Sequence, residues 1–117
     1  MNYTIRNKQH GRLFEHTVEM KTTRSPFIVM IRLAKKLYPE YSYTSKFVQN
    51  LGEYILSVNG VSETKYELVW MFLKKLDDGT ECMPDDGVNQ YRVHQGEHLI
   101  LSLMPRIMYN DVDSRCP

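Results

Sequence analysis

The chain has 117 residues, of which 42% are hydrophobic, and its 15 basic and 14 acidic residues give a formal net charge of +1. This length fits one domain around a single core, and the apolar content excludes a disordered chain. The balanced charge gives no electrostatic reason to expect a nucleic acid as partner. Membrane insertion is not expected either, because no apolar run reaches the roughly 18–20 residues that span a bilayer.

The N-terminal part of the sequence predicts a β-hairpin. A strand at Tyr3–Arg6 is followed by a turn at Lys8–Gly11 and a second strand at Leu13–Thr22. In the second strand, apolar or aromatic residues alternate with polar ones, which is the period of a half-buried strand. The inward set is Phe14, His16, Val18 and Met20.

One helix is predicted, over residues 25–38. Ser25 is placed to cap the free N–H groups, and Pro26 at the first helical position loses no hydrogen bond. Apolar residues recur at spacings of three and four and form a single stripe, which predicts packing against a sheet. The stripe consists of Phe27, Met30, Ile31, Ala34, Leu37 and Tyr38, and Pro39 ends the helix.

From Tyr41 onward the sequence predicts strands and turns. Asn59-Gly60 is a strong turn dipeptide, and the polar stretch from Lys74 to Asp86 is expected to be a loop. The expected strands are residues 41–47, 54–58, 67–73, 88–93 and 98–104. Two strands, one helix and then several strands predict an α+β fold of the β-grasp type, in which a mixed sheet wraps one helix. We expect one domain over residues 1–104 and an irregular C-terminal tail over residues 105–117.

The two cysteines leave the redox compartment open. Cys82 and Cys116 can form one disulfide, remain free thiols, or pair with another chain. Asn2-Tyr-Thr4 is a glycosylation sequon, which is consistent with secretion, although the chain carries no apolar signal-peptide segment.

No arrangement of residues indicates catalysis or a metal site. His94 and His98 are four residues apart, but Gly96 lies between them in a strand context, so they do not share a helix face. Cys82 has no evident histidine or asparagine relay that would make it a nucleophile. The chain is therefore expected not to be an enzyme.

Four phrases occur in order along the chain: Gly52-Glu-Tyr-Ile-Leu-Ser-Val-Asn-Gly60, Val69-Trp-Met-Phe72, Gly87-Val-Asn-Gln-Tyr91 and Gly96-Glu-His-Leu99. As an ordered set, the sequence resembles the C-terminal β-domain of the cobalamin carriers, intrinsic factor and transcobalamin, over about residues 3–103. In two places the sequence departs from the family pattern. Leu51 stands where the family has a tryptophan before glycine, and Val69 stands where it has a tyrosine.

The resemblance implies non-catalytic binding of cobalamin or a related corrinoid, as a cap over one face of the corrin ring. Position by position, it implies that the ligand is contacted by Ile55, by Phe72, and by Met83 or Pro84, with Leu51 at the edge. In the family, a large helical domain supplies most of the contacts to the corrin. A separate helical domain or a receptor is thus an implied partner, and secretion is an implied location.

An alternative function comes from a different class. β-grasp domains have sheet edges that can accept a partner strand, so the chain could be a stand-alone protein–protein interaction module. A corrinoid cap predicts that Ile55, Phe72 and Met83 lie close together on one exposed concave patch. An interaction module predicts that they are buried and that an unpaired edge strand is the exposed apolar feature.

Overall fold

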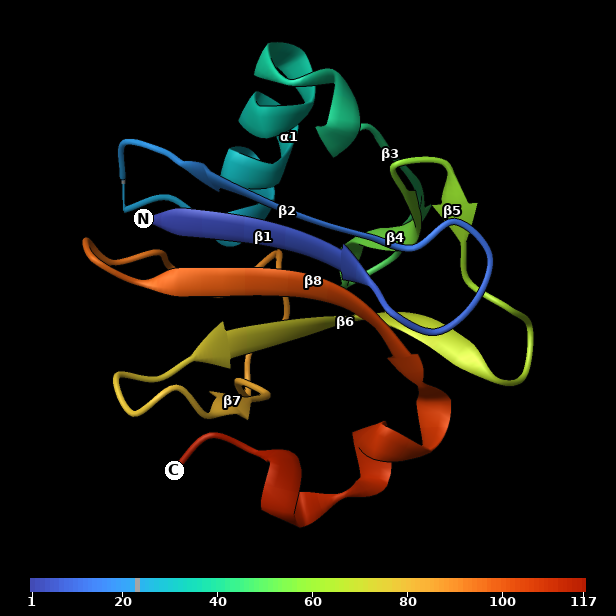
Figure 1. Ribbon diagram of the computed structural model, residues 1–117. Coiled ribbons are helices and arrows are strands. Elements are labelled where there is room, and N and C mark those ends of the chain that lie inside the picture. Colours follow the sequence, from blue (N-terminus) through green and yellow to red (C-terminus); the bar gives the residue numbers. More distant parts are fainter. Residues whose placement is uncertain (23) are drawn as a thin grey trace.

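A computed structural model describes residues 1–22 and 24–117 and contains a five-stranded mixed sheet with strand order β2-β1-β8-β6-β7 (Figure 1). These strands are β1 (Asn2–Asn7), β2 (Phe14–Glu19), β6 (Leu68–Lys75), β7 (Glu81–Cys82) and β8 (His98–Pro105). β1 pairs antiparallel with β2 and parallel with β8, so the first and last strands lie side by side at the centre of the sheet. The predicted α+β, β-grasp-like mixed sheet is confirmed.

A second, three-stranded sheet has the order β3-β4-β5 and consists of β3 (Tyr43–Val48), β4 (Gly52–Val58) and β5 (Val61–Ser62). Its turns lie where the sequence predicts them, because Asn50, Gly52, Asn59 and Gly60 all have positive φ angles. Left-handed backbone of this kind is tolerated mainly by glycine and asparagine.

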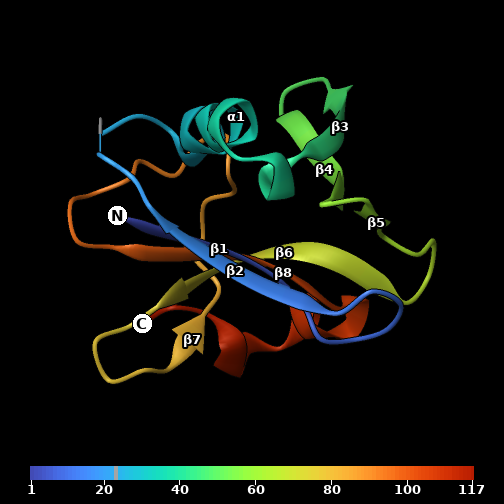
Figure 2. The same cartoon turned by 45° about the horizontal axis from the view of Figure 1, so that its top comes forward.

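The main core lies between the five-stranded sheet and the helix α1 (Phe27–Leu37), which crosses one sheet face beside the small sheet (Figure 2). Most of the predicted stripe is confirmed, since Phe27, Met30, Ile31 and Ala34 are completely buried. Leu37 is the exception, with 56% of its surface exposed. At roughly 100° per residue it lies about 80° around the helix axis from Phe27, on the flank of the stripe.

The start of α1 is capped by a distant loop and not by Ser25. The residue that precedes the helix is Pro26, which makes no side-chain cap. Instead the N–H groups of Phe27 and Ile28 donate to the carbonyls of Tyr91 and Val88, at 2.8 and 2.9 Å. These bonds satisfy donors that every helix start leaves free.

The strand predicted at residues 88–93 is wrong, because backbone groups of this segment bond to the start of α1 and not to a neighbouring strand. The Gly87 carbonyl accepts hydrogen bonds from the N–H groups of Gln90 and Tyr91, which folds this segment into a turn, and only an isolated bridge between Arg92 and Pro26 remains. The apolar residues that favour a strand here belong to the main core instead, where Val93 is buried and Val88 and Tyr91 pack against it.

The other face of the sheet is partly covered by the C-terminal segment, which we define as residues 106–117. This segment contains two 3₁₀ helices, η2 (Arg106–Asn110) and η3 (Val112–Ser114), where the sequence predicts only an irregular tail. A disulfide joins Cys116 to Cys82, which is one of the three states that the sequence left open for these cysteines. A smaller apolar cluster lies on this face and consists of Val69, Met71, Leu73, Met83 and Ile100, with Met104 and Met108 packed against it.

Among the described residues, no helix combines the length and the apolar character needed to cross a bilayer.

Candidate functional site

Two adjoining pockets lie where β4, β6, the 83–89 loop and η2 meet, with volumes of about 210 and 150 Å³. They share Phe72, Gly87 and Tyr109 as common walls, so we treat them as one groove. The first pocket is lined mainly by apolar side chains, and the second opens toward Asp85, Asp86 and Arg115.

All five residues singled out from the sequence line this groove. Leu51 and Ile55 lie in the first pocket, Met83 and Pro84 lie in the second, and Phe72 lies between them. They come from the turn before β4, from β4, from β6 and from the loop after β7, which the fold brings together over more than thirty positions of sequence. The structure therefore gathers these residues at one concavity.

Their exposure differs strongly within that concavity. Leu51 is 40% exposed, whereas Ile55, Phe72 and Met83 keep only 7%, 8% and 5% of their surface exposed. Phe72 in particular packs on the core, with ring centroids 4.9 Å from Phe27 and 5.2 Å from Tyr91. The floor of the groove is thus the outer surface of the main core at Ile55 and Phe72 and of the smaller cluster at Met83. Leu51 lies at its rim.

A side-chain amide holds the walls of the groove together. Asn89 accepts from the backbone N–H of Glu53 at 3.1 Å and donates to the Glu53 carbonyl at 2.9 Å, so it pairs with β4 as a neighbouring strand would. Gly52 makes this approach possible, because a Cβ there would lie 2.5 Å from the Asn89 Oδ1. The contact between Gly52 and Asn89 thus explains why these two residues occur in the phrases singled out from the sequence.

Glu53 lies beneath the groove in a polar cluster. Its carboxylate accepts from the Ser45 hydroxyl at 2.7 Å, the Tyr43 hydroxyl at 3.0 Å and the Arg32 Nε at 2.7 Å. Burial opposes ionisation, but the hydrogen bonds from Ser45, Arg32 and Tyr43 prevail and lower the pKa of Glu53. Glu53 is therefore a fixed negative charge beside an otherwise apolar wall.

Sequence reasoning missed three aromatic residues of the groove, Tyr54, Trp70 and Tyr109. Trp70 lines the first pocket and donates its indole N–H to the Val61 carbonyl at 2.9 Å. Tyr109 lines both pockets from η2. Trp70 lies within a motif that the sequence singled out, but Tyr109 lies in a segment without periodicity, where no signal pointed to it.

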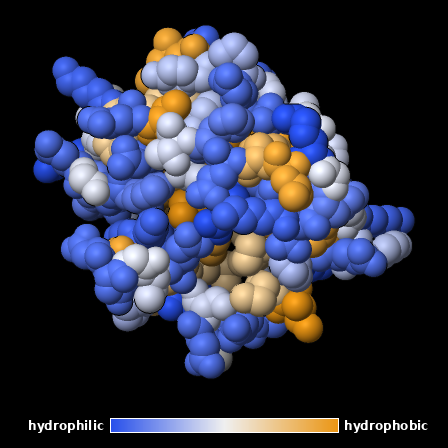
Figure 3. Space-filling view, viewed as in Figure 1, coloured by the Kyte–Doolittle hydropathy of each residue, from blue (hydrophilic) through white to orange (hydrophobic). Residues whose placement is uncertain are grey.

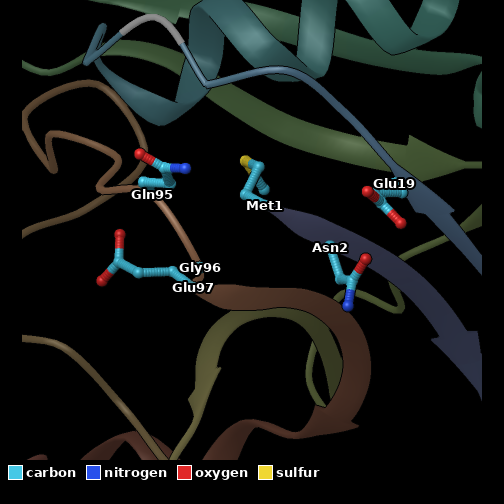
Figure 4. Close-up of a pocket in the computed structure, with 6 residues that line it drawn as sticks. All are labelled: Met1, Asn2, Glu19, Gln95, Gly96 and Glu97. Atoms are coloured by element: carbon cyan, nitrogen blue, oxygen red, sulfur yellow. The ribbon is translucent and has the colours of Figure 1, made fainter.

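A polar hollow of about 340 Å³ lies elsewhere, at the start of β1 (Figure 4). Its labelled residues come from β1, the end of β2 and the 95–97 turn, with Glu19 and Glu97 on opposite sides of Met1. The Glu97 carboxylate is already hydrogen-bonded to Tyr91 and to the His94 N–H. This hollow offers little apolar contact, so the groove is the better candidate for an organic ligand.

No protein-family model matches the sequence, and no curated protein matches it. Solved structures do match. Haptocorrin in complex with Cbi superposes with a TM-score of 0.66 at 20% identity, covering 89% of this chain. A candidate metal-binding protein from Ruminococcus gnavus superposes with a TM-score of 0.61 at 17% identity, covering 89% of this chain and 94% of that one.

The chain has the fold of a cobalamin-carrier β-domain.

The chain matches about a quarter of haptocorrin, since it covers 24% of that chain. The resemblance read from the sequence is thereby confirmed at the level of the fold. The Ruminococcus gnavus match shows that a chain of nearly this extent also occurs as a solved structure.

A metal site is not evident in the carrier-type β-domain. In the part of the chain that the structure describes, no group of three or more His, Cys, Asp and Glu side chains is placed to hold a metal ion. His98 lies half-buried with its Nε2 2.7 Å from the Thr4 hydroxyl. A threonine hydroxyl is not one of the usual zinc ligands.

Proposed function

We propose that the carrier-type β-domain binds cobalamin or a related corrinoid, without catalysis, through the groove. The observation that supports this most directly is the gathering of Ile55, Phe72 and Met83 at one apolar concavity in a domain with the haptocorrin fold. A corrin is a broad, partly apolar plate with amide arms, so apolar walls with a few polar groups are the appropriate surface for it.

The size of the groove determines how much of such a ligand it can contact. Pockets that enclose a drug-sized ligand have volumes of about 300–1,000 Å³. The two parts of the groove, at about 210 and 150 Å³, together reach only the low end of that range. A corrin is larger than a drug-sized ligand, so the groove can take an edge or an arm of it but cannot enclose it. The domain therefore acts as a cap, and a separate helical domain or a receptor covers the rest of the ligand.

The polar groups of the groove set the orientation of the ligand in this proposal. Asp85 and Asp86 line the open end of the second pocket, where they can accept hydrogen bonds from the amide arms. Leu51, Ile55, Phe72, Met83 and Pro84 contact the apolar part of the ring.

The proposal is tested by titrating the protein with aquocobalamin and with methylcobalamin, following the corrin absorbance and the heat of binding. Leu51→Ser is the informative variant, because Leu51 is 40% exposed and its loss leaves the core intact. Leu37→Ser is the matched control, since Leu37 is exposed at the end of α1 and does not line the groove. We expect saturable binding at about one ligand per chain, weakened about tenfold or more by Leu51→Ser and unchanged by Leu37→Ser.

Absence of any signal at high micromolar corrinoid would count against binding by this domain alone. Equal loss of affinity in both leucine variants would count against the groove. Phe72→Ala is a poor test, because Phe72 packs on Phe27 and its removal is expected to cost about 3–5 kcal/mol of stability.

One observation favours the second candidate, a protein–protein interaction module. β2 forms an edge of the five-stranded sheet, and Ile55, Phe72 and Met83 are largely buried. An edge strand of this kind presents free backbone groups to a partner strand. The corrinoid titration separates the two candidates, because strand addition at β2 gives no response to a corrinoid.

We also propose an extracellular location. The Cys82–Cys116 disulfide supports it, because disulfides persist in oxidising compartments and are rare in the cytosol. Mass spectrometry of protein secreted from its native cells would show an intact disulfide, whereas detection of two free thiols in a cytosolic fraction would contradict this location.

A further inference from the structure

The C-terminal segment forms part of the groove but is weakly attached to the domain. Tyr109 lines both pockets, and Arg115 lines the second. Figure 3 shows apolar side chains in a hollow beside this segment, on a face that is otherwise mostly hydrophilic. η2 contributes no fully buried residue, and Ile107 is 76% exposed. Met108 packs against the smaller apolar cluster, so the segment is held by partial burial and not by a core residue of its own.

Among the described residues, the backbone hydrogen bonds that attach the segment to the rest of the domain lie at its two ends. The Arg106 N–H donates to the Glu67 carbonyl at 2.7 Å where the segment begins. At the far end, backbone hydrogen bonds of 2.6 and 2.9 Å join Met83 to Ser114 and Cys116. The ion pair between Arg115 and Asp85 is long, at 3.9 Å, and Asp85 is almost fully exposed, so this pair contributes little.

The disulfide is the strongest attachment, and it lies at the groove itself. Cys82 ends β7 and directly precedes Met83 and Pro84, which line the second pocket. Cys116 follows Arg115, which lines the same pocket from the opposite chain segment. One covalent bond therefore joins two walls of the groove. Cys82 is buried, but Cys116 is partly exposed, so its sulfur can be reached by a thiolate.

We propose that the Cys82–Cys116 disulfide is a redox latch. When oxidised it holds the C-terminal segment in place as a wall of the groove, and when reduced it lets the segment detach. A dithiol reductant, such as a thiol–disulfide oxidoreductase, supplies two electrons and two protons. Its first thiolate attacks the Cys116 sulfur, and Cys82 leaves as a thiolate that is protonated. The second thiol then displaces Cys116, which leaves as a thiol, and the reductant becomes a disulfide.

The consequence is release of residues 106–117 from the face of the sheet and withdrawal of Tyr109 from both pockets. The groove loses a wall, so a bound ligand is held in an oxidising compartment and released in a reducing one. Only this effect on ligand affinity rests on the proposed function; the release of the segment does not.

The latch is tested by comparing the oxidised protein with protein reduced by dithiothreitol, after confirming two free thiols by titration. Hydrogen exchange measured by mass spectrometry reports on the segment, and acrylamide quenching reports on Trp70, the only tryptophan and a lining residue of the groove. On reduction we expect amide exchange in residues 106–117 to accelerate at least about tenfold and quenching of Trp70 to increase, while β1 and β8 stay protected.

Two variants keep the test decisive. Cys116→Ser breaks the latch at the partly exposed partner and leaves Cys82 as a small buried side chain, so it is expected to match the reduced protein. Tyr109→Ala in the oxidised protein removes the aromatic wall while the disulfide remains, so it is expected to increase quenching without releasing residues 111–117.

Unchanged exchange of the C-terminal segment in both the reduced protein and Cys116→Ser would overturn the latch. Corrinoid affinity is compared between the oxidised protein and a Cys82→Ser/Cys116→Ser double variant, which has no thiol that could bind cobalt. A drop of about tenfold supports both proposals. Release of the segment without corrinoid binding in either form supports the latch and contradicts the proposed function.

Discussion

Gly52 is the residue at which the groove depends most directly on backbone geometry. Its φ angle is +104°, and an added Cβ would lie 2.5 Å from the Asn89 side chain. We expect Gly52→Ala to lower the free energy of unfolding by about 2–4 kcal/mol, because backbone strain adds to loss of the Asn89 contact. Gly11→Ala is the matched control, since Gly11 has a φ of +76° and open space around it. Urea denaturation measures both, and equal losses would show that the Asn89 contact contributes nothing.

Glu53 makes stability depend on pH in one direction. Although burial disfavours its charge, hydrogen bonds from Ser45, Arg32 and Tyr43 lower the pKa of Glu53 in the folded protein. A carboxyl whose folded pKa lies below its unfolded pKa stabilises the protein above the unfolded value of 4.5. That contribution is lost as the pH falls through the lower, folded pKa.

We therefore expect Glu53→Gln to flatten the acid side of the stability profile. The variant should be less stable than the wild type at pH 7, and the difference should shrink as the pH falls below the ordinary carboxyl range. Denaturation at a series of pH values between neutral and about pH 3 measures this. Two curves that run parallel over the whole range would show that the Glu53 carboxylate gives no pH-dependent stabilisation.

At the scale of elements, local periodicity predicted those that bury one face. The hairpin strand β2 alternates half-buried and exposed residues as its sequence indicates, and α1 buries the predicted stripe up to Ala34. The prediction of a strand at residues 88–93 was wrong because the polar groups of this segment bond to two different elements. Its carbonyls cap α1 and its Asn89 amide pairs with β4, and no short-range pattern encodes such long-range bonds.

Asn89 is where this loop holds β4, so its removal is expected to loosen the groove. Asn89→Ala leaves the Glu53 N–H and carbonyl without their partner and should cost about 1–3 kcal/mol of unfolding free energy. Gln90→Ala is the control, because Gln90 makes one exposed hydrogen bond of 3.2 Å to the Leu51 carbonyl and should cost about 0.5 kcal/mol or less. Acrylamide quenching of Trp70 should rise in the first variant only. Equal effects of the two substitutions would contradict a clamping role for Asn89.

Across the whole molecule, the fold was predictable from the sequence, and the five residues named from the resemblance line the groove. The part that the C-terminal segment contributes to the groove was not predicted. Ile55, Phe72 and Met83 were identified through resemblance to the carriers, and the fold places them together. Tyr109 and Arg115 could not be predicted, because their position depends on a disulfide between residues 34 apart in sequence. In the chain-entropy model, a disulfide that closes a loop of that length stabilises the folded protein by about 3–4 kcal/mol. This is a large part of the total stability of a small domain.

In the proposed function the groove, and not the β2 edge, is the surface that meets a ligand. Nuclear magnetic resonance of the isotope-labelled, oxidised protein during titration with aquocobalamin distinguishes the two surfaces. We expect amide shift changes that saturate together at Leu51, Ile55, Phe72 and Val88, with β2 unaffected. Saturating changes confined to β2, or an unchanged spectrum at high micromolar corrinoid, would contradict it.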